Sequence, residues 1–380
     1  MNENMIQLKY KGFFRGFTLV LIFLICSNSV LNAQKKSKKK KPEYDVEFGL
    51  ATYYDDNILK YSKKYLDRFL NNEDEGRFHI STYDDVVISP ALGLSVSYRL
   101  FGKMESVFSI DADYSQYFNN DIKSWGIFGV GYRQYVNKRL NFSLNYDYIP
   151  EFYVRHFRDD DWTAVYGYTE ESFTPYSFSK DNFGIWGEYK FFKDTRVSLY
   201  YQLGKYYHNK HYTEFDSDNH LYRIKVYQPL HKNFNFEATY QFVRSLAKGY
   251  DEPGGSKETS DTGDATYDED GFIFGLTWKL PRVKKRYHSL KLETIIYNRY
   301  YQTDLSPIED DMHSGRVDNN LRFYLSYYLS VSREFKFKAF YKWYGRDSGT
   351  TSPINQEFVS DEKDYKQNQI GVEFIYRLGL

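Results

Sequence analysis

The sequence predicts an all-β fold in which about fourteen antiparallel strands form a closed, up-and-down barrel across a membrane. Three observations lead to this prediction. Apolar and polar residues alternate with a period of two along most of the chain after residue 42. The connections between the alternating segments are alternately short and long. The chain is also rich in β-forming aromatic residues, with 40 Tyr and 31 Phe in 380 residues, and its mature part has no run of roughly 20 apolar residues that could form a membrane helix.

The stretch NFSLNYDYIPEFYVRHF shows the alternation most clearly. Phe142, Leu144 and Phe152 share one parity, whereas Asp147 falls on the other. Since successive side chains of a strand leave opposite faces, we expect a face toward lipid and a face toward a polar lumen. Pro150 cannot donate a ladder hydrogen bond, which predicts a β-bulge or a strand end beside it. Fourteen such segments are predicted: Tyr44–Tyr54, Val86–Leu100, Glu105–Phe118, Ile122–Val136, Leu140–Phe157, Tyr176–Phe191, Arg196–His208, His220–Leu230, Phe234–Leu246, Gly271–Leu280, Tyr287–Gln302, Val317–Ser330, Phe335–Gly345 and Gln367–Leu380.

The fourth segment is the least regular of the set. Its Trp125 and Ile127 have the parity opposite to that of Phe128 and Val130. An apolar residue on the lumen side contradicts a simple division between lipid and water.

The connections differ in length between the two ends of the predicted strands. Even-numbered strands are followed by short connections, and odd-numbered strands by long polar ones, except at Asn119–Asp121. This asymmetry is typical of membrane barrels with short periplasmic turns and long extracellular loops. The short connections are Gly102–Lys103, Asn137–Arg139, Phe192–Thr195, His231–Asn233, Pro281–Arg286 and Val331–Glu334; the long ones are Asp55–Asp85, Arg158–Pro175, Asn209–Asn219, Ala247–Asp270, Thr303–Arg316 and Arg346–Lys366.

The lengths of the strands favour a membrane over a soluble sandwich. The predicted strands span about 10 to 17 residues, whereas soluble strands cluster near five or six and a tilted membrane strand needs about nine to eleven. An open sheet would leave unpaired backbone groups that lipid cannot satisfy. A closed barrel is therefore expected.

The chain divides into three predicted parts. Residues 1–33 have a basic start and the apolar run FTLVLIFLIC, as in a signal peptide. Residues 34–42 form a Lys-rich tail, expected in the periplasm, and residues 43–380 form the barrel. Cys26 is the single cysteine and lies in the signal segment, so the mature chain has no thiol chemistry. The balance of 51 basic and 51 acidic residues argues against a nucleic-acid partner.

The last predicted strand, NQIGVEFIYRLGL, carries a resemblance to a known class. Ile370, Val372, Phe374 and Tyr376 alternate toward the C-terminus, and the chain resembles the Gram-negative outer-membrane β-barrels of the porin-like class. The resemblance implies a place in the bacterial outer membrane, with lipid, lipopolysaccharide and the barrel-assembly machinery as partners. Members usually end in an aromatic residue, whereas this chain ends in Leu380. The oligomeric state is left open.

The parity opposite to the apolar one supplies the candidate lumen residues. Charges of both signs occur on it, and they could either set the selectivity of a pore or pair across the lumen as struts. Fourteen strands lie between filled small barrels and wide porins, so a narrow or loop-plugged pore is expected. We predict no catalytic residue, no metal ligand and no cofactor. The predicted lumen residues are Arg99, Asp111, Asp113, Arg133, Asp147, Glu151, Arg155, Glu188, Arg223, Lys225, Glu293, Arg299, Arg322, Glu373 and Arg377.

Three functions are compatible with these patterns. A porin-like passive channel for small hydrophilic solutes is the first. The second is a rim-active hydrolase of lipid or peptide, for which His156 and the group of His208, His211 and His220 with nearby acids are candidates. The third is a plugged structural or surface-interaction barrel. It would require loops such as SKKYLDRFLNN, with a predicted short helix that presents Tyr65, Leu66, Phe69 and Leu70, to fold into the mouth.

Overall fold

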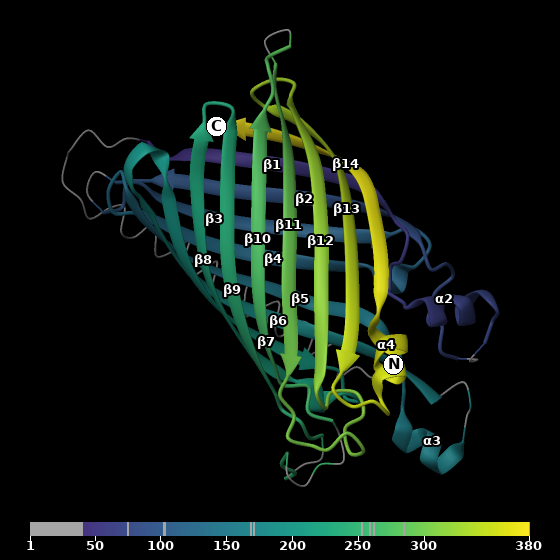
Figure 1. Ribbon diagram of the computed structural model, residues 1–380. Helices are drawn as coiled ribbons and strands as arrows, with labels where there is room; N and C mark the ends of the chain where they lie inside the picture. Colours follow the sequence, from purple (N-terminus) through teal and green to yellow (C-terminus); the bar gives the residue numbers. More distant parts are fainter. Residues whose placement is uncertain are drawn as a thin grey trace, which may run out of the picture. The chain divides into compact units, whose positions relative to one another are not determined.

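The computed structural model is a closed barrel of fourteen antiparallel strands, as predicted (Figure 1). The described residues are 41–73, 76–101, 104–167, 169, 172–251, 254–257, 260, 263–283 and 286–379. The predicted signal segment, most of the Lys-rich tail and Leu380 lie outside them. Each strand pairs with its sequence neighbours, and β1 pairs with β14 to close the barrel. The strands are β1 Glu43–Asp55, β2 Asp85–Tyr98, β3 Ser106–Tyr117, β4 Trp125–Tyr135, β5 Leu140–Arg158, β6 Phe173–Lys190, β7 Arg196–His208, β8 Ser217–His231, β9 Phe234–Ala247, β10 Tyr267–Lys279, β11 Tyr287–Tyr301, β12 Arg316–Ser330, β13 Phe335–Thr350 and β14 Tyr365–Gly379.

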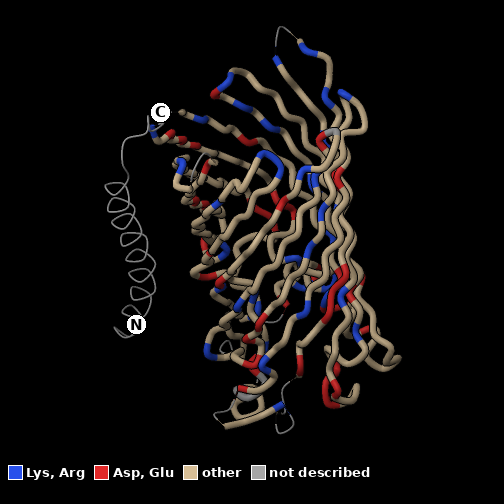
Figure 2. Tube along the Cα trace, turned by 90° about the vertical axis from the view of Figure 1, so that its left-hand side faces the viewer, with Lys and Arg blue, Asp and Glu red and all other residues tan. Residues whose placement is uncertain are grey.

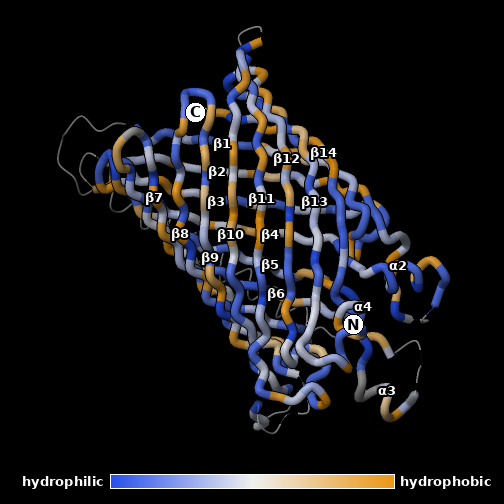
Figure 3. The backbone as a smooth tube through the Cα atoms, in the orientation of Figure 1, coloured by the Kyte–Doolittle hydropathy of each residue, from blue (hydrophilic) through white to orange (hydrophobic). Residues whose placement is uncertain are grey.

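The alternation of the sequence becomes the two faces of the barrel wall. On β5, Phe142 is 49% exposed and Leu144 is 53% exposed, whereas Ser143 and Asn145 line an internal cavity. Hydrophobic and hydrophilic positions alternate along the strands in the same way in Figure 3. Apolar side chains that are exposed on the outside of a closed barrel are in the environment that lipid provides.

Several strands extend beyond their predicted ends on the long-loop side. β10 begins at Tyr267 rather than Gly271, and β13 ends at Thr350 rather than Gly345. The added residues are paired with their neighbours. Outside the hydrocarbon both faces meet water, so the pairing continues where the apolar–polar alternation stops.

The long connections gather at one end of the barrel and carry most of the helical structure. The helices α2 (Lys63–Leu70), α3 (Asp160–Tyr166) and α4 (Gln356–Lys363) lie at this end in Figure 1. The short 3₁₀ helices are η1 (Asp121–Lys123) and η4 (Thr213–Phe215) on the same side and η3 (Phe192–Asp194) in a short turn. Among the residues described, no helix is long and apolar enough to span a membrane.

The predicted irregularity at Pro150 is confirmed as a β-bulge. The pairing of β5 with β6 shifts between Ile149 and Phe152, and it shifts again between Tyr153 and Arg155. The first shift turns Phe152 out of the expected alternation. Its ring lies 5.4 Å from that of Trp125, which packs against a buried cluster, so the prediction that Phe152 faces lipid is wrong. Glu151 lies inside the bulge, and the alternation behind its prediction as a lumen residue therefore does not hold there.

Candidate functional site

Loop 1, residues 56–84, folds against the barrel wall at the long-loop end. Its predicted helix is confirmed as α2, and the hydroxyl of Ser62 accepts a hydrogen bond from the Tyr65 N–H at the helix start. Leu66 and Phe69 pack against a buried cluster as predicted, whereas Leu70 is 61% exposed. Loop 1 is therefore part of the packed core. The buried cluster consists of Ile58, Leu59, Tyr61, Tyr65 and Ile80 of loop 1 with Val87, Tyr117 and Tyr153 of the wall.

The first turn of loop 1 reaches two different parts of the wall. Arg155 of β5 donates hydrogen bonds from Nη2 to the carbonyl oxygens of Leu59 at 2.9 Å and Lys60 at 3.1 Å. The Lys60 ammonium lies 5.9 Å from the ring centre of Tyr344 on β13 and 5.8 Å from that of Tyr365 on β14. Loop 1 therefore bridges β5 and the β13–β14 wall, which narrows the mouth of the barrel.

A buried polar junction fixes the start of loop 1 to the last strand. The Nε2 of Gln367 donates to both carboxylate oxygens of Asp55 at 2.8 Å and to the carbonyl oxygen of Asn57 at 3.1 Å. The side-chain amide nitrogen Nδ2 of Asn57 in turn donates to the backbone carbonyl oxygen of Lys366 at 2.9 Å. Asp55 is 1% exposed and Gln367 is 2% exposed, so each of these bonds replaces contacts with water.

Loop 1 is also tied to loop 7, residues 351–364. The Lys64 ammonium of α2 lies 2.8 Å from a carboxylate oxygen of Asp361 on α4. The Tyr65 hydroxyl donates to the Glu362 carboxylate. Two loops that are nearly 300 residues apart in sequence thus meet through paired charges at the same end of the barrel.

The loops of this end bring several buried or enclosed basic groups together. Burial, together with the neighbouring Arg322, lowers the pKa of Lys60 to about 8. Burial and the nearby Arg316 lower the pKa of Lys363 to about 7. The Lys60 side chain is exposed although protein surrounds it, which indicates that it faces an internal aqueous space.

Lys123 of η1 is buried, and its pKa makes the stability of the protein depend on pH. Its ammonium donates to the Tyr153 carbonyl oxygen at 2.6 Å. Burial and the nearby Lys60 and Arg155 charges lower its pKa from 10.5 to about 7. The unfolded chain therefore binds more protons between these two pH values, and the Lys123 contribution to stability improves as the pH rises through this window.

Replacing Lys123 by Met is expected to remove this contribution. Between pH 7 and pH 9.5 the free energy of unfolding of the parent should rise relative to that of Lys123→Met by roughly 1 to 3 kcal/mol. Urea unfolding in detergent, followed by tryptophan fluorescence, measures the difference at each pH. If the free energies of unfolding of the two proteins changed in parallel with pH, the lowered pKa of Lys123 would be contradicted.

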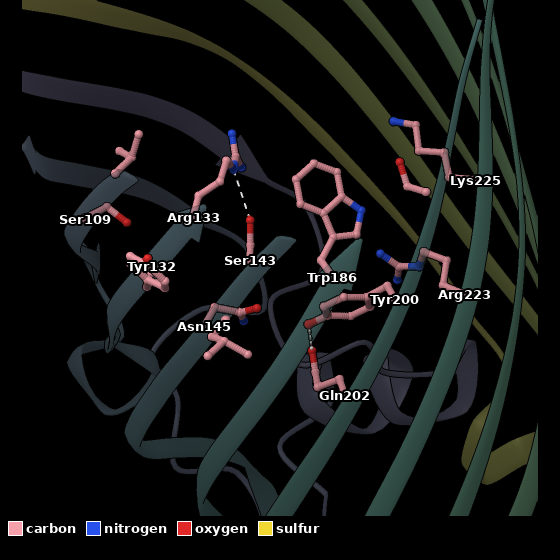
Figure 4. A pocket seen from close by; sticks show the side chains of 14 residues that line it. Ser109, Tyr132, Arg133, Ser143, Asn145, Trp186, Tyr200, Gln202, Arg223 and Lys225 are labelled. Carbon is pink, nitrogen blue, oxygen red and sulfur yellow. Dashed lines mark hydrogen bonds between the residues drawn. The ribbon is translucent and has the colours of Figure 1, made fainter. Parts of the chain in front are cut away.

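The inner wall formed by β3 to β8 encloses a cavity of about 600 Å³ (Figure 4). Trp186 of β6 stands between Arg133 on one side and Arg223 and Lys225 on the other. Arg133 donates from Nε to the Ser143 hydroxyl at 3.0 Å. The cavity therefore combines guanidinium groups, neutral hydroxyl and amide groups and the faces of aromatic rings. Its lining residues are Val107, Ser109, Gly131, Tyr132, Arg133, Ser143, Leu144, Asn145, Trp186, Ser198, Tyr200, Gln202, Arg223 and Lys225.

Three of the predicted lumen residues line this cavity, namely Arg133, Arg223 and Lys225. Arg155 holds loop 1, as described above. Arg322 donates from Nη2 to the Tyr297 hydroxyl. Arg99 follows the end of β2.

Most of the other predicted lumen residues have partners of opposite charge. Glu373 lies 2.8 Å from Lys338, Glu293 lies 2.8 Å from Lys291, and Arg299 lies 2.9 Å from Glu269. Each of these pairs joins residues of one strand or of two neighbouring strands, so it lies along the wall and does not cross the lumen as a strut. Two further pairs are Arg377 with Asp45 at 2.9 Å and Glu188 with Arg196 at 3.9 Å.

Asp111 and Asp147 belong to a lateral row in which carboxylates alternate with glycines. The paired positions across β1 to β5 are Glu47, Gly93, Asp111, Gly129 and Asp147. A Cβ at Gly129 would lie 2.9 Å from Oδ1 of Asp147. The glycines therefore leave room for the carboxylates to lie along the wall. Asp113 follows on the same face of β3. Figure 2 shows charges of both signs along the strands.

The histidines that were candidates for the hydrolase alternative do not come together in the structure. Nδ1 of His208 lies 3.4 Å from Asp216, that of His211 lies 3.6 Å from Asp159, and that of His220 lies 2.9 Å from the Tyr201 hydroxyl. Leu199 on β7 and Ile224 on β8 are exposed on the outer face, and Tyr201 and Tyr222 have the same parity as these two residues. His208 has the opposite parity on β7 and lies on the inner face. His220 shares the parity of Ile224 on β8 and lies on the outer face. Within the described part of the chain, no group of three potential ligands could hold a metal ion.

His156, the second candidate, is also accounted for by packing. Its ring stacks on that of His79 of loop 1 with centroids 3.6 Å apart, and its Nδ1 lies 2.7 Å from the Tyr153 hydroxyl. Neither partner is a carboxylate or a serine. The geometry gives no support to the hydrolase alternative at this position.

Two functional candidates were missed at the level of sequence, namely Trp186 and Lys60. Trp186 shares the parity of Glu188 rather than that of Ile185, which could have placed it in the lumen. Lys60 lies in a loop, where no periodicity predicts the direction of a side chain.

The chain matches no protein-family model and no curated protein. Among solved structures, a bacterial polysaccharide outer membrane secretin is similar over 88% of this chain and 98% of its own, with 7% identity and a TM-score of 0.46. The outer membrane channel DcaP of Acinetobacter baumannii matches over 91% and 100%, with 13% identity and a TM-score of 0.44. OprD from Pseudomonas aeruginosa matches over 92% and 96%, with 11% identity and a TM-score of 0.40. Likenesses at this level carry no argument about the function of this chain.

The architecture itself identifies the class of protein. The barrel is closed, so every strand has two partners. Its outer surface exposes Phe, Leu, Ile and Tyr side chains on strand after strand, and its short and long connections are segregated to opposite ends. A closed barrel with an apolar outer face satisfies the requirements of a lipid environment, where a soluble protein would bury these side chains. The protein has the architecture of a transmembrane β-barrel.

Proposed function

We propose that the protein is a passive channel for small hydrophilic solutes. The observation that supports this function is the cavity of about 600 Å³ on the inner wall. Hydroxyl, amide and guanidinium groups are placed among its apolar and aromatic surfaces, and such groups can replace the hydration shell of a passing solute. The second mapped cavity supports the same path, since it opens among the short turns at residues 137–139, 190–196 and 229–232. Loop 1 forms the narrow section at the other end.

The plugged barrel is the second candidate, and loop 1 is the observation that favours it. The buried cluster and the contacts between α2 and α4 occupy the long-loop end. A loop held in this way could restrict the pore to small solutes or close it. The two candidates differ in whether ions cross the folded barrel.

Purified protein inserted in planar lipid bilayers is expected to give discrete conductance steps in 1 M KCl, a concentration that screens most charge effects on conductance. Folding is checked independently by the shift in gel mobility of a β-barrel on heating in detergent. A heat-denatured sample is the control and should give no steps. Persistent silence of a folded, inserted sample would overturn the channel and favour the plugged barrel.

A further inference from the structure

A single lateral row of inward positions runs across eleven of the fourteen strands. Residues that are paired across neighbouring strands share a face of the sheet, so the pairing register traces such a row directly. We name it the arginine–aromatic row. Its members, from β4 to β14, are Arg133, Ser143, Trp186, Tyr200, Arg223, Gln241, Gly271, Tyr297, Asn320, Arg346 and Tyr365.

The row climbs from one end of the barrel to the other. Arg133 lies two residues before the end of β4, at a short turn. Tyr365 is the first residue of β14, directly after loop 7. Tilted strands produce this rise, because a line perpendicular to the strands spirals along the barrel axis. The row therefore connects the cavity of Figure 4 with the mouth that loop 1 narrows.

Each cation of the row lies beside an aromatic ring of the same row. The guanidinium carbon of Arg133 is 5.0 Å from the ring centre of Trp186, and that of Arg223 is 5.7 Å from Tyr200. The guanidinium carbon of Arg346 is 5.2 Å from Tyr365. Two cations adjoin the row: Arg322, 4.7 Å from the ring centre of Tyr297, and Lys60, 5.8 Å from that of Tyr365.

Between β4 and β14 the row contains no acidic residue, and its guanidinium groups have mainly neutral partners. The same register continues from Arg133 through Val107 and Ser97 to Glu43 on β1, at the short-turn end. Arg133 donates to Ser143, and Arg223 donates from Nη2 to the Gln241 amide oxygen at 3.0 Å. Arg346 donates from Nε to the Asn320 amide oxygen at 3.0 Å and has Asp318 at 3.9 Å. Over the described residues, neither Arg133 nor Arg223 lies within ion-pair distance of a carboxylate. Three of the lumen carboxylates, Glu47, Asp111 and Asp147, belong to the separate row on β1 to β5. Glu269 and Asp318 lie two positions from the row and are paired with Arg299 and Arg316.

We infer that the arginine–aromatic row is a binding path for anionic solutes whose carboxylate is attached to a ring. A guanidinium presents a fork of N–H donors that matches a carboxylate, and Trp and Tyr faces stack on aromatic or sugar rings. Repetition of this pair along the row offers successive equivalent sites, which permits movement without tight retention. The inference rests on the proposed channel function.

Ion selectivity tests the charge of the row. Under a KCl gradient the reversal potential of the parent channel is expected to show a permeability ratio of Cl⁻ to K⁺ above one. The triple variant Arg133→Gln, Arg223→Gln, Arg346→Gln should lower this ratio several-fold. Arg244→Gln is the matched control, because Arg244 lies on the outer face, where its side chain is 56% exposed, and this variant should keep the parent ratio. A cation-selective parent, or an unchanged ratio in the triple variant, overturns the inference.

Block of the ionic current tests the ring. Benzoate and glucuronate represent the aromatic and sugar sources of a ring carboxylate, whereas acetate lacks the ring and glucose lacks the charge. Either ring carboxylate, or both, is expected to block at a concentration several-fold below that of acetate and glucose. Trp186→Leu should abolish this difference, and Trp278→Leu should preserve it, because Trp278 is on the outer face and 42% exposed. Equal block by all four solutes overturns the inference.

The failure of the channel function and the failure of this inference give different results. Silent bilayers would refute the channel alone. Tryptophan fluorescence of the folded protein in detergent then still tests the row: benzoate or glucuronate should change the emission of the parent and of Trp278→Leu and leave that of Trp186→Leu unaffected. An emission that none of the four solutes changes in any of the proteins would refute the binding path as well.

Discussion

Replacing residues 57–83 of loop 1 by a short Gly-Ser linker is expected to raise the unitary conductance several-fold. Loop 1 carries the buried cluster and spans the mouth from Arg155 to Tyr344 and Tyr365. Its removal leaves the barrel wall intact, because Asp55 and Asp85 at its ends are paired with each other. Conductance depends on the narrowest section of a pore, so the change should be large if that section is formed by loop 1.

Removal of the α3 segment provides the matched control for this experiment. Val165 and Tyr166 at the end of α3 are 72% and 63% exposed, so its loss should change the conductance little. Heat modifiability on gels confirms that both deletion variants are folded. If the loop 1 deletion conducts like the parent, the constriction lies elsewhere in the lumen.

Gln367→Leu is expected to destabilise the folded barrel by about 1.5 to 3 kcal/mol, the range for hydrogen bonds to a charged group. The substitution removes the two hydrogen bonds from Gln367 to Asp55 and the bond to the Asn57 carbonyl. Asp55 still accepts hydrogen bonds from the Gln369 side chain and from the Asn57 backbone N–H. Because Asp55 is buried, water cannot replace the donor that Gln367 supplied. The midpoint of urea unfolding in detergent measures the loss.

Gln302→Leu is the control for this substitution, because the exposed Gln302 donates only to the carbonyl oxygen of Tyr300. It should change the free energy of unfolding by less than about 0.5 kcal/mol. The double variant Asp55→Leu, Gln367→Leu should lose less than the sum of the two single variants, because no unpaired carboxylate remains. Strict additivity would show that the two groups do not act as a pair.

The strands were predictable because lipid and water impose their difference on every second residue. This local signal predicted all fourteen strands and the order of short and long connections. Pro150 predicted the position of the first bulge in β5. The irregular fourth segment also has a physical explanation. Trp125 is an apolar residue on the inward parity because loop 1 supplies an apolar surface inside the barrel, and the sequence of β4 contains no information about loop 1.

The arginine–aromatic row was not predictable, because lateral neighbours depend on register. Trp186 and Arg223 are separated by 37 positions in sequence and meet in one cavity only through the pairing of β6, β7 and β8. A shift of one residue in either pairing would replace every partner. The candidate histidine group did not assemble for a related reason. His208 and His220 are close in sequence, but the chain reverses direction between β7 and β8. Their side chains lie on opposite faces of the wall.

The two register shifts of β5 also constrain how this protein could have evolved. Each shift adds one residue relative to β6, and each reverses which face the following side chains meet. Because there are two, Arg155 again pairs with Tyr176 on the inward face and can hold the backbone of loop 1. An ancestor with only one of these insertions would have turned Arg155 toward lipid and released the loop. The two extra residues therefore act together to place Arg155, although neither lies in the cavity.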